Sequence, residues 1–140
     1  EWGCPEDDFA ICSEEITLNY GPSPQESEAS SDISTAESLI SEAQSAISSA
    51  QSKIQEALRV GADVTQANSY LASANTDLEN AQTYLTQAKN AFSNKDYTSA
   101  ESYAETAQEY AKSAKNYANL AKSAAEEAMK EIVQNWIKKL

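Results

Sequence analysis

The sequence has no histidine, one methionine, three glycines and only ten basic residues among its 140. Against 22 acidic residues, those ten give a formal net charge of −12, so the chain lacks the clustered Lys and Arg that nucleic-acid binding requires. The same charge disfavours an anionic membrane surface, and no apolar run approaches the roughly 20 residues that cross a bilayer. We therefore expect no nucleic-acid partner and no membrane insertion.

Residues that carry catalysis are also missing. The chain has no Gly-rich phosphate loop, and no Ser or Cys nucleophile stands beside a credible base. Adjacent carboxylates such as Glu126 and Glu127 would point to different faces of a helix. The sequence thus predicts a protein that is not an enzyme, with no catalytic residue, no cofactor and no dedicated metal site. Five acids near the start could bind calcium, but they lack the spacing of a calcium loop, and a solvated acidic face is the simpler interpretation: Glu6, Asp7, Asp8, Glu14 and Glu15.

The two cysteines, Cys4 and Cys12, lie eight residues apart near the N-terminus. Without histidine they cannot complete a conventional zinc site, and they do not form a CxxC redox motif. A local disulfide is the simplest interpretation, and it predicts an extracellular or cell-surface protein, whereas two reduced thiols would fit a cytosolic chain. The opening letters EWGCPEDD are typical of a processed mature terminus or a trimmed chain.

A seven-residue repeat dominates residues 32–58, with isoleucine at one heptad position and alanine three residues later. It predicts one apolar stripe along a helix from about 24 to 59. Ser23 is the expected N-cap, Pro24 suits the first turn, and Gly61 ends the helix.

The repeat continues in two more predicted helices, at about 63–93 and 97–138. Asp63 is the expected cap of the second helix, and Thr98 with Glu101 forms a possible capping box for the third. Both heptad positions of the third helix are alanine, and Tyr103, Tyr110 and Tyr117 follow one edge of that stripe. The residues expected to face other helices are Ile33, Ile40, Ile47, Ile54, Leu71, Leu78, Leu85, Ala104, Ala107, Ala111, Ala114, Ala118 and Ala121.

The alternation of large and small residues indicates how the helices pack. Large side chains on two helices need small ones opposite if the axes are to approach closely, and the alanines of the third helix supply them. Both connections are short, so consecutive helices must be antiparallel. The expected fold is all-α: an elongated, alanine-rich, up-down-up three-helix bundle in residues 24–140, with coiled-coil packing.

The turn before the third helix carries a local likeness. Asp96, Tyr97, Ala100, Tyr103, Ala104 and Ala107 give a segment that resembles the turn and second helix of a tetratricopeptide repeat. The resemblance covers less than a fifth of the chain and implies a helical hairpin, without a peptide-binding function.

Residues 1–23 form an N-terminal extension of different composition, without the heptad. The letters EEITLNY predict a short strand, which must pair or dock because an isolated strand is unstable in water. Docking on its own bundle and docking on another molecule are both open.

The C-terminal end of the third helix is apolar on one face. By helix length, it should overrun the turn at Gly61 and find no helix beside it. A contiguous apolar patch that contains a tryptophan usually marks an interface. The expected assembly interface therefore combines this overhang with the apolar residues of the extension: Phe9, Ile11, Ile16, Leu18, Met129, Ile132, Val133, Trp136, Ile137 and Leu140.

Three functions fit these features. The first is a structural protein that self-assembles end to end into a filament or layer, with itself as partner, the N-terminal segment of one subunit packing on the overhang of the next. The second is a spacer or stalk, or a binding module, of a larger surface protein. The third is an adaptor that binds other protein helices along the tyrosine edge.

Overall fold

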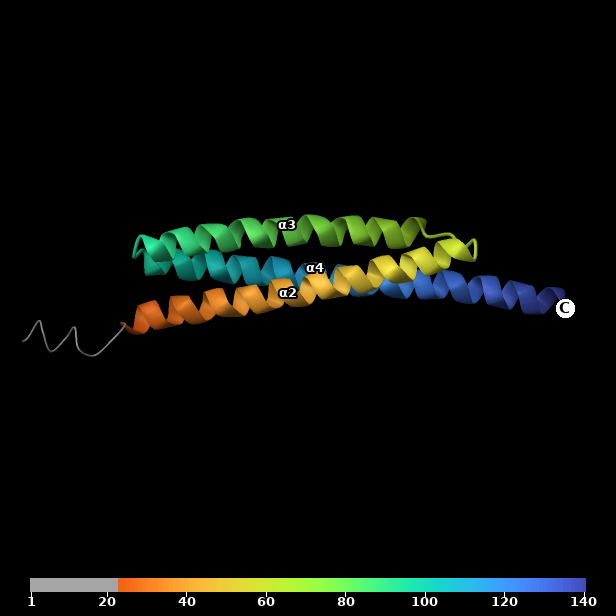
Figure 1. Cartoon of the computed structure of the whole chain (residues 1–140), viewed down its shortest axis with the longest axis horizontal. Coiled ribbons are helices and arrows are strands. Elements are labelled where there is room, and N and C mark those ends of the chain that lie inside the picture. Colours follow the sequence, from red (N-terminus) through yellow and green to blue (C-terminus); the bar gives the residue numbers. More distant parts are fainter. Residues whose placement is uncertain (1–22) are drawn as a thin grey trace, which may run out of the picture.

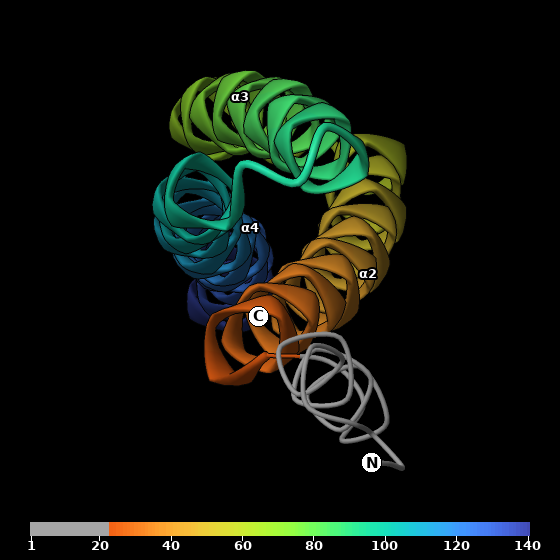
Figure 2. The same cartoon turned by 90° about the vertical axis from the view of Figure 1, so that its left-hand side faces the viewer.

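The computed structural model describes residues 23–140, which form three helices packed side by side: α2 (Pro24–Arg59), α3 (Thr65–Ser93) and α4 (Tyr97–Lys139). The predicted all-helical class is confirmed. In Figure 1, α3 runs back along α2, and α4 then runs in the direction of α2 and continues past the α2–α3 turn. The end view in Figure 2 places α4 against both of the other helices.

The ends of α2 agree with the sequence signals. The Ser23 hydroxyl accepts a hydrogen bond from the Glu26 amide at 3.1 Å, and Pro24 occupies the first turn. At the other end, Gly61 has φ +80°, and the Ala62 amide donates to the Ala57 carbonyl. This backbone pattern is the Schellman motif, in which glycine occupies a left-handed position that costs other residues more.

The other two helix starts differ from the expectation. Helix α3 begins two residues later than predicted, because Asp63 accepts hydrogen bonds from the amide and hydroxyl of Thr65 instead of capping the helix. Helix α4 is capped by Asp96, which accepts from the Ser99 amide at 3.3 Å, so the predicted capping box of Thr98 with Glu101 is wrong. The tight turn before α4 closes through Lys95, which has φ 64°.

Alanine makes up most of the core. Within residues 23–140, the only larger side chains in the buried set are Ile40, Ile47, Ile54 and Val64. Because alanine has almost no side chain beyond Cβ, the helix axes can approach closely, and each helix exposes most of its circumference.

The predicted packing residues differ in how deeply they are buried. Ile40, Ile47 and Ile54 are buried, and so are the alanines of α4: Ala104, Ala107, Ala111, Ala114, Ala118 and Ala121. Ile33 and the three leucines of α3 are only half-buried: Leu71, Leu78 and Leu85. The fully buried positions of α3 are instead its heptad alanines, Ala67, Ala74, Ala81 and Ala88.

Polar contacts fix how α2 and α4 align. The Gln108 side-chain amide donates to the Asp32 carbonyl at 2.8 Å, and Lys115 Nζ lies 3.0 Å from Glu42 Oε1. Gln108 precedes Lys115 along α4, and their partners on α2 follow in the same order, as parallel helices require. The first residue of α2 and the last residue of α4 consequently lie at opposite ends of the bundle (Figure 1).

Candidate assembly surface

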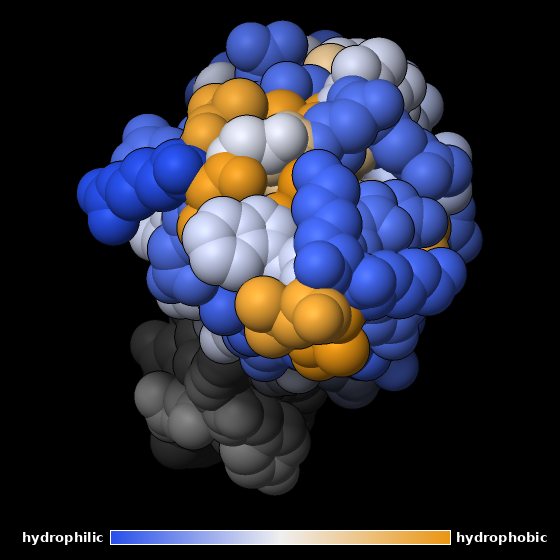
Figure 3. Space-filling model, turned by 90° about the vertical axis from the view of Figure 1, so that its right-hand side faces the viewer, coloured by the Kyte–Doolittle hydropathy of each residue, from blue (hydrophilic) through white to orange (hydrophobic). Residues whose placement is uncertain are grey.

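The last turns of α4 carry half of the large apolar side chains that the described bundle leaves in solvent. Val133, Trp136, Ile137 and Leu140 are each more than half exposed, and the exposed fraction of Trp136 is 71%. They belong to the last turns of α4, the helix that continues past the α2–α3 turn (Figure 1). Viewed from this end, hydrophobic side chains gather beside hydrophilic ones in Figure 3.

These residues line an open groove of about 620 Å³ between the end of α4 and the end of α2. Its lining is apolar except for one guanidinium and consists of Arg59, Val60, Met129, Ile132, Val133, Trp136, Ile137 and Leu140. We call this set the tail groove. A volume of this size is in the range of pockets that hold ligands, and its chemistry suits apolar side chains accompanied by a negative charge.

The free part of α4 begins later than the sequence suggested. Met129 and Ile132 are half-buried and pack against the core cluster that contains Ile54 and Ala62. The overhang therefore starts at about Val133, and Met129 with Ile132 forms the floor where the groove joins the bundle. Sequence reasoning also missed Arg59 and Val60, because it treated the α2–α3 turn only as a chain reversal.

The predicted site residues of the N-terminal segment cannot be placed in the same way. Phe9, Ile11, Ile16 and Leu18, the cysteines Cys4 and Cys12, and the five candidate calcium ligands all lie outside the residues that the structure describes. Among residues 23–140, no group of three or more Cys, Asp and Glu side chains is arranged to hold a metal ion.

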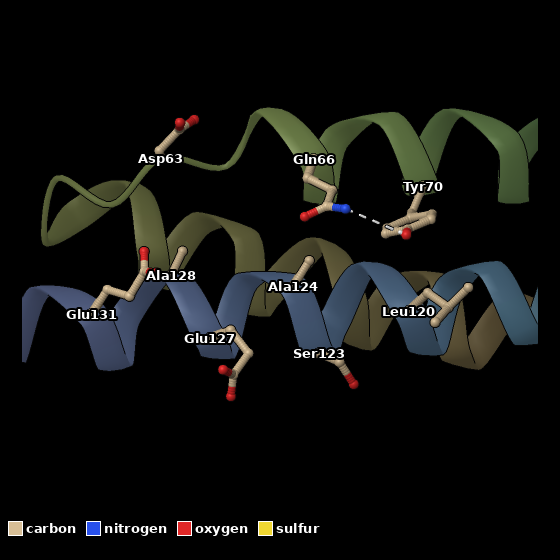
Figure 4. A pocket seen from close by; sticks show the side chains of 9 residues that line it. All are labelled: Asp63, Gln66, Tyr70, Leu120, Ser123, Ala124, Glu127, Ala128 and Glu131. Carbon is tan, nitrogen blue, oxygen red and sulfur yellow. Dashed lines mark hydrogen bonds between the residues drawn. The ribbon is translucent and has the colours of Figure 1, made fainter.

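A second hollow, of about 410 Å³, lies between the start of α3 and the second half of α4 (Figure 4). It is more polar than the tail groove and includes Asp63, Glu127 and Glu131. Hydrogen bonds from Thr65 lower the pKa of Asp63. In Figure 4 the carboxylates of Asp63 and Glu127 point in opposite directions, so they do not converge on one ligand.

The predicted tyrosine edge of α4 contacts tyrosines of α3. Tyr84 lies between Tyr103 and Tyr110, with ring-centroid distances of 6.2 and 5.6 Å, and Tyr70 stacks on Tyr117 at 6.3 Å. Sequence reasoning missed Tyr70 and Tyr84. The signal was present, because they are fourteen residues apart and share a heptad position that flanks the α3 stripe. Most of this edge is thus engaged inside the bundle, which weakens the adaptor hypothesis.

Carboxylates gather at the opposite end of the bundle, where α2 and α4 begin. Partial burial raises the pKa of Glu101, and the nearby charges of Glu28, Asp32 and Glu105 raise it further. Burial and the neighbouring Glu26 likewise raise the pKa of Tyr97. This end of the described bundle is therefore rich in negative charge.

The chain matches no protein-family model, and no curated protein and no solved structure matches it significantly. None of the described helices is both long enough and apolar enough to serve as a membrane span.

Proposed function

We propose that this protein is a non-enzymatic structural subunit, secreted or displayed at the cell surface, that self-assembles end to end into a filament or layer. The observation that carries the proposal is the tail groove, an apolar surface at one extreme end of a long, otherwise polar bundle. Exposed apolar patches on soluble proteins are usually interaction sites, and tryptophan is prominent among the residues that dominate binding energy.

The proposal commits the groove to a second copy of this chain. The N-terminal segment is attached to the start of α2, at the end of the bundle opposite the groove (Figure 1). Two different surfaces at opposite ends make heterologous contacts, and such contacts extend without limit when the rotation between subunits does not close a ring. The predicted Cys4–Cys12 disulfide would belong to this segment and supports export to an oxidising compartment.

Replacement of Trp136 by alanine tests the proposal. We expect Trp136→Ala to leave the helical circular dichroism unchanged and to abolish large assemblies in sedimentation velocity and electron microscopy, because truncation of a central interface tryptophan commonly costs about 2 kcal/mol or more of binding energy. The matched control is Leu120→Ala, which removes an apolar side chain that is 46% exposed on the same helix but outside the groove.

Two results would contradict the proposal. If Trp136→Ala assembled like the wild type, the groove would not be the contact surface. If the wild-type chain remained a monomer at high concentration, it would be the spacer or binding module of a larger surface protein.

A further inference from the structure

The partner of the tail groove follows from distances along the chain. Helix α2 has 36 residues and is about 54 Å long at 1.5 Å per residue. The groove begins at Arg59, the last residue of α2, and extends away from the start of that helix. Any residue before Ser23 must therefore cover the whole length of α2 to reach the groove of its own molecule.

The apolar residues of the N-terminal segment are too close to Ser23 to do this. Phe9 precedes Ser23 by 14 residues, which span at most about 50 Å when fully extended. Ile11, Ile16 and Leu18 are closer still to Ser23 and reach less far. Ile11, Ile16 and Leu18 cannot enter the groove of their own molecule, and Phe9 reaches at most its near edge. In an end-to-end arrangement, by contrast, the start of one rod is adjacent to the groove of the next.

The charge at the groove favours an acidic occupant. Arg59 lines the groove, and Lys130, whose Nζ lies 3.3 Å from Glu127 Oε1, lines an adjoining hollow of about 580 Å³. Lys139 follows Ile132 by seven residues, which places both on the same face of α4. Glu126 is the acid in the adjoining hollow, and Lys53 Nζ lies 4.0 Å from it. Residues 1–22 contain six acidic residues and no basic one: Glu1, Glu6, Asp7, Asp8, Glu14 and Glu15.

The competing occupant is the same surface of a second copy. The apolar residues of α4 are symmetric about the midpoint between Gln134 and Asn135, and the equidistant pairs are Met129 with Leu140, Ile132 with Ile137, and Val133 with Trp136. This spacing suits antiparallel self-pairing. Such pairing would place Lys139 of one copy opposite Lys130 of the other but Lys138 opposite Glu131, so charge does not favour it, whereas the acidic N-terminal segment complements Arg59 and Lys139.

We propose that residues 9–18 of one subunit fill the tail groove of the next, with Phe9, Ile11, Ile16 and Leu18 as the apolar contacts and Glu14 and Glu15 beside Arg59. This inference rests on the proposed function and adds direction to it: each subunit donates a segment at one end and accepts one at the other. Every joint is then the same heterologous contact.

Complementation between two defective full-length chains tests the inference. Trp136→Ala damages the groove and leaves the segment, while the double variant Ile16→Ser/Leu18→Ser damages the segment and leaves the groove. Each variant alone should be monomeric in sedimentation velocity. An equimolar mixture should form a species of two rods and nothing larger, because only one intact groove and one intact segment can meet.

Charge reversal gives an independent readout of the same contact. Arg59→Glu alone, and Glu14→Lys/Glu15→Lys alone, should each weaken assembly several-fold, and the two together should recover most of the loss. Antiparallel self-pairing predicts a different pattern, in which Ile16→Ser/Leu18→Ser assembles like the wild type and the lysine variant has no effect.

These experiments distinguish failure of the proposed assembly from failure of the inferred occupant of the tail groove. Large assemblies that depend on Trp136 but are indifferent to the segment variants would overturn the inference and leave the proposed function standing, whereas a closed dimer held by Trp136 would overturn both. A wild-type chain that never assembles, or assembly that does not need Trp136, would overturn both.

Discussion

Tyr84 of α3 stacks on Tyr110 of α4, with ring centroids 5.6 Å apart and ring planes only 9° from parallel. The two rings lie at the edge of the α3–α4 contact, where both are half-buried. Since buried side chains between these helices are mainly alanine, the tyrosines supply much of the contact area that the small residues lack.

The stacking of Tyr84 on Tyr110 should couple the effects of their substitution on the free energy of unfolding. We expect Tyr84→Ala and Tyr110→Ala to be non-additive by about 0.5–1.5 kcal/mol in a double-mutant cycle measured by urea denaturation. Tyr84 and Tyr117 belong to separate stacks, so their cycle should show coupling close to zero. Equal coupling in both cycles would mean that the substitutions act through the whole bundle rather than through the stacked pair.

The alanine core should not accept larger residues. Ala111 is fully buried, and Ala111→Leu should destabilise the protein by about 1–3 kcal/mol, because overpacking forces the helix axes apart. Ala72→Leu is the matched control, since Ala72 is an exposed alanine on α3. Thermal melts should show a lower midpoint for the first variant only, and an equal response of both would contradict the close helix approach.

Acidification should stabilise the end of the bundle that holds Glu101. Partial burial and the charges of Glu28, Asp32 and Glu105 raise the pKa of Glu101 above its ordinary value of 4.5, so the folded state binds a proton more readily than the unfolded state. Between pH 4.5 and the raised value, this group's contribution to stability therefore increases as the pH falls, and it is lost as the pH rises.

Glu101→Gln tests this pH dependence. The variant should be more stable than the wild type at pH 7, and the difference in urea midpoint should shrink toward pH 4.5. Glu109→Gln removes the same charge from an exposed position of α4 outside this group and should have a smaller effect. A difference for Glu101→Gln that stays constant with pH would show that the carboxylate charge is not the cause.

In the turn before α4, substitution of one residue by glycine should not destabilise the protein, unlike most substitutions by glycine. Lys95 has φ 64°, a left-handed conformation that costs a residue with Cβ roughly 1 kcal/mol or more relative to glycine. Lys95→Gly should therefore be neutral or stabilise the protein by up to about 1 kcal/mol. Lys112→Gly, within the regular part of α4, should instead destabilise it by about 1 kcal/mol, and calorimetry of both variants gives the comparison.

The predicted Cys4–Cys12 disulfide should be separable from the bundle. Intact-mass analysis should show a chain two hydrogens lighter than its reduced form, without dimers linked through cysteine. Reduction should leave the helical circular dichroism and the melting midpoint nearly unchanged, because residues of the three described helices form a core among themselves. Two free thiols in protein purified without reductant would reject the disulfide.

The number and limits of the helices could be predicted because the sequence marks them locally. Ser23 with Pro24 starts α2, Gly61 ends it, and the heptad identifies the inner face of each helix. The prediction for the cap of α4 was wrong because two possible acceptors, Asp96 and Thr98, lie near the unpaired backbone amides of the first turn. Sequence spacing alone does not show which of the two accepts the hydrogen bond.

The depth of burial could not be predicted from the heptad. Leu71, Leu78 and Leu85 share a repeat with Ala67, Ala74 and Ala81, yet only the alanines are fully enclosed. When small residues bring helix axes together, the larger neighbours are displaced toward the edge of the contact. The spacing of apolar residues along α4 predicts its apolar face. The contribution of Arg59 and Val60 to the groove could not be predicted, because it depends on where the α2–α3 turn meets α4.

The placement of the bundle's two ends has a mechanical consequence. A pulling force applied between Ser23 and the end of α4 acts along two parallel helices, so it must pass from α2 to α4 sideways through their shared contact (Figure 1). That geometry loads the α2–α4 contact in shear along its length, and the contacts of α3 with both helices share the load. Resistance to such a force depends on the rate of unfolding, and we expect the pulled molecule to extend by sliding α2 along α4 before either helix uncoils.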